Sequence, residues 1–248
     1  MLVGAYFTYA FIVQFGFPWP LGMALTILAS VVLGVVVERL VLRPMVGEPV
    51  ISLIMVTVGL SSLLRAAVGF VWGTQPNRFP AFIPSEPVSF AGATVGSDRL
   101  WAIVVAMVLL VGFTLFFRFT RAGIAMRAVA DDQQAAMSMG ISVNRVFGWA
   151  WAIGAVSAAL AGAILANIVG VGPELGHFGL VVFPVVIVGG LDSIAGAIVG
   201  GLLIGLLQAY TGGYIGQGLN QVVPYIVLIG ILMVRPYGLF GEVKVERV

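Results

Sequence analysis

The chain has 248 residues, of which 60% are hydrophobic and 9% are charged, with a formal net charge of +2 and a mean hydropathy of +1.12. Soluble globular domains carry roughly 25% charged residues, so this composition excludes an ordinary soluble domain and predicts an integral membrane protein. The absence of cysteine excludes disulfides, zinc–thiolate sites, iron–sulfur clusters and cysteine nucleophiles.

Apolar segments follow one another along the chain and predict an all-α membrane protein, a polytopic helical bundle of about seven spans. The expectation rests on length, since a spanning helix needs roughly 20 residues. The predicted apolar helices cover residues 1–15, 20–37, 50–72, 101–117, 146–168, 194–210 and 221–234.

Residues 178–190 predict a broken or half-length helix. This segment is too short to cross a membrane comfortably, contains Pro184, and runs into a Gly-Gly-Leu-Asp-Ser turn. Such helices are tolerated where the backbone lines a protein cavity. Asp192 in the turn has two interpretations: it caps the following helix, or it binds a cation or a substrate amine.

Basic residues concentrate in three connections between the predicted spans. Nine of the 12 Lys and Arg residues lie there: Arg39, Arg43, Arg118, Arg121, Arg127, Arg145, Arg235, Lys244 and Arg247. The positive-inside rule therefore places these connections in the cytoplasm. Residues 73–98, rich in Pro, Gly, Ser and charge, are expected to form an extracytoplasmic loop without regular structure.

Residues 118–146, hereafter the polar segment, are expected to face a soluble partner in the cytoplasm. Within this segment, residues 123–140 predict one short amphipathic helix that ends at Gly140, a residue able to adopt the left-handed conformation. Ser142 is expected to cap the next helix. Residues spaced by four, three and four form the polar face: Arg127, Asp131, Gln134 and Ser138. The residues off that face are Ala125, Val129, Ala136 and Met137.

Polar side chains within or beside the predicted spans are candidates for a solute pathway. They are Thr57, Ser61, Ser62, Asn167, Asp192 and Gln208. Most polar residues in such spans instead hydrogen-bond to neighbouring helices, so both interpretations stay open. Arg65 also lies at membrane depth, where it either lines the pathway or extends toward the outer interface.

The sequence carries no common signature of a hydrolytic enzyme. It has no phosphate-binding glycine loop, no HExxH zinc motif and no Gly-x-Ser-x-Gly elbow. Its single histidine excludes a metal site built from several histidines. We therefore expect no catalytic residue, no metal and no cofactor, and any ATP that drives transport must be bound by another polypeptide.

Four motifs, in this order, resemble the permeases of branched-chain amino acid ABC importers, the LivH-type family. Residues 134–140, Gln-Ala-Ala-Met-Ser-Met-Gly, resemble the Glu-Ala-Ala-x-x-x-Gly coupling segment of ABC importer permeases, with Gln in place of Glu. The other three are RAGIAMRAVAD at 121–131, GGLDSIAGA at 189–197 and RPYGLFG at 235–241. Family members carry one further span before the counterpart of residues 2–6, so about eight crossings are expected in a full-length protein.

The resemblance implies one permease domain over residues 1–248, in a bacterial or archaeal cytoplasmic membrane, that moves branched-chain or related amino acids inward. The implied ATPase-coupling residues are Arg127, Asp131, Gln134, Ala135, Ala136 and Gly140. The implied partners are a second homologous permease, two ABC ATPase subunits, a periplasmic or lipid-anchored solute-binding protein and membrane lipid, with no nucleic acid. A permease for urea, amides or sugars, or an ion-coupled secondary transporter that uses Asp192, remains an alternative.

Overall fold

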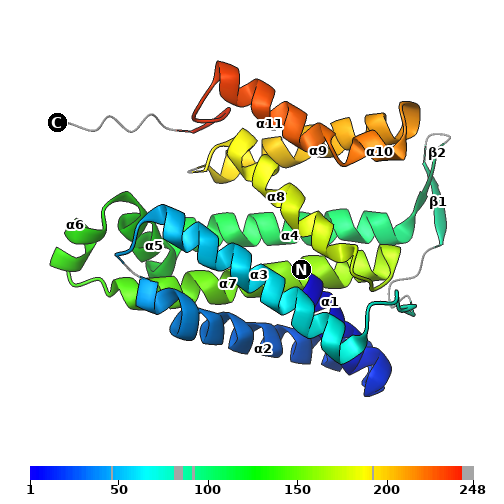
Figure 1. Ribbon diagram of the computed structural model, residues 1–248, viewed down its shortest axis with the longest axis horizontal. Helices are drawn as coiled ribbons and strands as arrows, with labels where there is room; N and C mark the ends of the chain where they lie inside the picture. The colour runs from blue at the N-terminus through cyan, green and yellow to red at the C-terminus, as the bar shows by residue number, and fades with distance from the viewer. Residues whose placement is uncertain (46, 81–85, 91–92, 192, 242–248) are drawn as a thin grey trace. The chain divides into compact units, whose positions relative to one another are not determined.

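The computed structural model describes residues 1–45, 47–80, 86–90, 93–191 and 193–241. Within these residues the regular elements are helices and one two-stranded β-hairpin (Figure 1). Its contacts group the chain into two compact units: unit 1, Met1–Leu175, and unit 2, Gly176–Val248. A single permease domain over residues 1–248 stays a prediction.

Five helices in the described residues are long and apolar enough to cross a membrane: Trp19–Met45, Ile51–Trp72, Ser97–Phe119, Val143–Val169 and Ile194–Tyr214. Three shorter apolar helices are Leu2–Gln14, Leu175–Gly189 and Gly218–Val234. The all-α membrane fold predicted from the sequence is therefore confirmed.

Unit 1 contains seven α-helices in the described residues. The first, α1 (Leu2–Tyr9), continues into the π-helical turn η1 (Ala10–Gln14), and α2 (Trp19–Val37) continues through η2 (Glu38–Leu42) and η3 (Arg43–Met45). The others are α3 (Val50–Trp72), α4 (Ser97–Phe119), α5 (Arg121–Asp131), α6 (Gln133–Ser138) and α7 (Val143–Val169). A proline in its first turn favours the start of α2.

Helix α7 is central to unit 1 and packs closely against α1 and α2. A Cβ atom added at Gly34 of α2 would lie 2.8 Å from the Cβ of Ala155 and 2.9 Å from the carbonyl oxygen of Trp151. A Cβ atom at Gly4 of α1 would likewise meet the backbone of Ala159. Small residues permit this close approach in lipid, where van der Waals packing drives helix association.

The polar segment and the β-hairpin lie at opposite ends of unit 1, because α4 connects them (Figure 1). The 23 residues of α4 extend over about 34 Å, slightly more than the roughly 30 Å hydrocarbon core of a bilayer. This separation agrees with a cytoplasmic polar segment and an extracytoplasmic loop over residues 73–98.

The prediction that residues 73–98 lack regular structure was wrong. Strand β1 (Pro87–Phe90) pairs antiparallel with β2 (Ala93–Gly96), and α4 begins at Ser97. β-Branched and aromatic side chains in these segments favour strands, and Pro87 is tolerated because it is the first residue of its strand. The high proline content of this loop had favoured the prediction of irregular structure.

The predicted half-length helix is α8 (Leu175–Gly189), which contains Pro184 and belongs to unit 2 from Gly176 onward. The other helices are α9 (Ile194–Tyr214), α10 (Gln217–Asn220) and α11 (Val223–Val234). The turn after α8 includes Gly190 at φ +109°. Asp192 lies outside the described residues, and the cap of α9 is Ser193, whose Oγ accepts a hydrogen bond from Gly196 N at 3.0 Å.

Candidate functional site

The polar segment folds as two helices, so the prediction of one helix over residues 123–140 was wrong. Helix α5 ends at Asp131, and Asp132 adopts an extended backbone conformation (φ −152°, ψ 110°). Its Oδ1 accepts hydrogen bonds from Gln134 N at 2.8 Å and Ala135 N at 2.9 Å, which caps α6. Aspartate is a preferred cap because this side-chain bonding competes with helix continuation.

The break divides the predicted polar face between two short helices. Arg127 and Asp131 lie on α5, whereas Gln134 and Ser138 lie on α6. All four side chains are exposed. The two helices therefore present two adjoining polar surfaces instead of one continuous stripe.

The opposite side of the polar segment packs within unit 1, against the start of α7. Val129, Ala136 and Val143 form a buried apolar cluster in which Ala136 is only 4% exposed. Ala135, the residue before it, is exposed. Met137, predicted to lie with the apolar residues, is 54% exposed. The two adjacent alanines of the motif thus have opposite environments.

A glycine-dependent turn joins α6 to α7. Gly140 has φ +79°, as predicted, and its N–H donates to the carbonyl of Met137 at 2.9 Å. Ile141 N donates to the carbonyl of Ala136 at 3.0 Å, which completes a Schellman arrangement. Ser142 occupies the cap position of α7, but its side chain makes no capping hydrogen bond, contrary to prediction.

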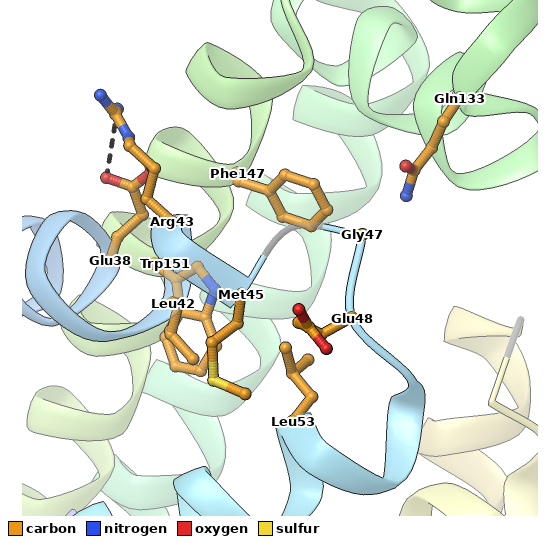
Figure 2. A pocket seen from close by; sticks show the side chains of 10 residues that line it. All are labelled: Glu38, Leu42, Arg43, Met45, Gly47, Glu48, Leu53, Gln133, Phe147 and Trp151. Carbon is orange, nitrogen blue, oxygen red and sulfur yellow. Dashed lines mark hydrogen bonds and ion pairs between the residues drawn. The ribbon is translucent and has the colours of Figure 1, made fainter.

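A cavity of about 200 Å³ lies beside the polar segment (Figure 2). Its lining comes from the end of α2, the following turn, the start of α3, α6 and α7: Glu38, Leu42, Arg43, Met45, Gly47, Glu48, Leu53, Gln133, Phe147 and Trp151. Glu38 is 2% exposed and accepts from Arg43 Nε at 3.1 Å, whereas the Arg43 side chain is 44% exposed. This pair was not among the predicted site residues, although two opposite charges five residues apart at the end of a span could have indicated it.

The predicted pathway residues fall into separate groups. Thr57, Ser61 and Ser62 lie on α3, where their hydroxyls donate to carbonyls of the same helix at 2.8–3.2 Å. Asn167 lies on α7, and Gln208 lies on α9 of unit 2, where its Nε2 donates to Asn220 O at 3.3 Å. The described residues contain no cluster of three or more His, Cys, Asp or Glu that could hold a metal ion.

Comparison with known proteins identifies the family. The family model described as branched-chain amino acid transport system / permease component matches residues 1–232. The chain belongs to this family. As a member, the permease is a subunit of a transport system and a multi-pass protein of the bacterial or archaeal cytoplasmic membrane.

Relatives cover most of the permease. It is 31% identical over 220 residues to the high-affinity branched-chain amino acid transport system permease protein LivH of Escherichia coli K12, covering 86% of the chain and 71% of that protein. Identity to BraD of Pseudomonas aeruginosa, described in the same words, is 31% over 239 residues, with 92% and 78% covered. A probable LivH of Methanocaldococcus jannaschii is 27% identical over 258 residues, with 97% and 80% covered. No solved structure matches the chain.

Proposed function

We propose that the permease is the membrane-spanning subunit of an ATP-driven importer for branched-chain or related amino acids. The relatives described as branched-chain amino acid permeases support the solute class. The observation that supports an ATP-driven mechanism is the structure of the polar segment, whose apolar side is buried and whose polar side is exposed. A surface built in this way suits docking of a soluble ATPase subunit.

Two such ATPase subunits would bind and hydrolyse the ATP. Their contact surface on the permease comprises Arg127 and Asp131 of α5 with Gln134 and Ala135 of α6. Ala136 and Gly140 act differently, because they hold α6 against α7. A movement of the ATPase pair would thereby displace α7. Because α7 packs closely against α1 and α2, these two helices would move with it.

The transport cycle then follows from a shift between two permease states. A solute-binding protein delivers the amino acid to a pathway formed with a second homologous permease. ATP-driven closure of the ATPase pair favours one state over the other, and product release reverses that preference. The stiffness of the connection between α6 and α7 is the physical requirement for this coupling.

Reconstitution tests the proposal. Proteoliposomes that contain this permease, the second permease and two ATPase subunits should take up labelled leucine, isoleucine or valine when ATP and the loaded binding protein are supplied. Omission of this permease should abolish uptake. Uptake that follows a sodium or proton gradient without ATP would support the ion-coupled alternative, and uptake of only urea, amides or sugars would reject the solute class.

A further inference from the structure

Helix α3 carries a polar column that runs along one exposed face. Thr57, Ser61 and Arg65 are spaced by four residues, so they lie one above another on the helix. Ser61 and Arg65 are exposed and Thr57 is half-buried. Ser61 and Arg65 are therefore not covered by the core of unit 1.

The Arg65 side chain extends toward the N-terminal end of α3. Its Nε donates to the carbonyl of Ser61 and its NH2 donates to the Ser61 hydroxyl, both at 3.4 Å. This direction is general for long side chains in helices, because the Cα–Cβ bond tilts toward the N-terminus. The guanidinium thus lies closer to the middle of the helix than its Cα does, and away from the outer interface.

Ser61 is the middle residue of α3, a helix long enough to cross a membrane. Ser61 lies eleven residues from each end of the 23-residue helix α3. Eleven residues correspond to about 16 Å, and half of the hydrocarbon core is about 15 Å. A charged guanidinium facing lipid at this depth is strongly disfavoured, so ionisable residues placed there face water or a polar partner.

The hydrogen-bonding capacity of Arg65 is largely unused. Guanidinium has five N–H donors, of which two make long contacts with Ser61. In the part of the chain that the structure describes, no carboxylate pairs with Arg65. A planar group with free donors on one edge matches the two oxygens of a carboxylate.

We propose that Arg65, which contacts Ser61 near the middle of α3, forms a binding site for the α-carboxylate of the transported amino acid at the middle of the pathway. The site rests on the proposed import of amino acids, and it adds that the permease recognises the carboxylate group itself. Substrate sites of secondary transporters commonly lie near the bilayer midplane, and ionisable residues inside spanning segments commonly mark substrate pathways.

Because the permease contains no cysteine, single thiols test the site directly. In the complete reconstituted transporter, Ser61→Cys is treated with a charged, water-soluble methanethiosulfonate, and modification is read on this chain after gel separation. Leu63→Cys is the matched control, since Leu63 is 63% exposed at nearly the same depth on the opposite side of α3. We expect rapid modification of Ser61→Cys, at least about tenfold slower modification of Leu63→Cys, and about tenfold protection of the former by leucine.

Recognition of the carboxylate is tested with leucinamide, which keeps the ammonium and side chain of leucine but lacks the carboxylate. Leucinamide should give no protection, and Arg65→Gln in the Ser61→Cys background should remove protection by leucine, whereas Arg65→Lys should retain part of it. Three results would overturn the site: equal reactivity of the two thiols, equal protection by leucinamide, or full protection in Arg65→Gln. ATP-dependent leucine uptake by wild-type vesicles of the same preparation separates the two proposals. Uptake by these vesicles without protection of Ser61→Cys by leucine rejects only the site. Absence of uptake rejects the proposed function.

Discussion

Two neighbouring alanines in α6 allow the same substitution to test two different roles. Ala136 is 4% exposed within the cluster of Val129 and Val143, whereas Ala135 is exposed. Ala136→Asp would place a carboxylate without a partner in an apolar site, at a cost of about 3 kcal/mol or more. A helix of six residues cannot offset that cost, so we expect α6 to detach from α7.

Ala135→Asp should leave the local structure intact. Position 135 is the third residue of α6, and an acidic side chain near a helix N-terminus is stabilising by about 0.3–1 kcal/mol. The nearby carboxylate of Asp132 offsets part of this gain. The net change in local stability should therefore lie within about 0.5 kcal/mol.

Limited trypsin digestion in inside-out vesicles measures the difference, since exposed Arg127 and Arg145 flank α6. A loss of about 3 kcal/mol corresponds to an increase in cleavage rate of about 100-fold for Ala136→Asp when cleavage follows the open population. Ala135→Asp should be cleaved at the wild-type rate. Its binding to the ATPase subunits should be weaker than that of the wild type. Both variants should lose ATP-driven uptake. Wild-type resistance of Ala136→Asp, or full uptake by Ala135→Asp, would refute this account of α6.

Three further substitutions, two of them paired with a comparison variant, test the packing and capping of unit 1. Gly34→Ala inserts a methyl group between α2 and α7, so it should cost about 1–3 kcal/mol and lower the melting temperature of the complex. Gly59→Ala is the control: no atom lies within 4 Å of the added Cβ, so the melting temperature should not fall. In the same assay Arg43→Gln should destabilise by about 3 kcal/mol, because it leaves buried Glu38 unpaired, and Glu38→Gln should destabilise less. Asp132→Ala removes two capping bonds and should cost about 1 kcal/mol, measured as faster trypsin cleavage of the polar segment.

The long helices were predictable because their boundaries depend on local chemistry. The predicted span over residues 50–72 coincides with α3, since a proline precedes it and Gly73, at φ +82°, follows it. Pro184 and the glycine pair after it likewise indicated the half-length helix α8. Such residues act on the backbone directly, so their effect does not depend on distant contacts.

The break in the polar segment was missed because helical periodicity was read across Asp132. The aspartate was available as a signal, since its preference for capping is a local property. The cavity beside α6 could not be predicted, because it depends on how the end of α2 approaches Phe147 and Trp151 of α7. Sequence spacing alone contains no information on that distance.

The docking role of the polar segment is tested most directly by a single thiol at Gln134, an exposed residue of α6. Gln134→Cys should react with a membrane-impermeant maleimide in inside-out vesicles but not in right-side-out vesicles, and added ATPase subunits should protect it. Labelling from the outer side, or unchanged labelling when the ATPase subunits are bound, would contradict the account.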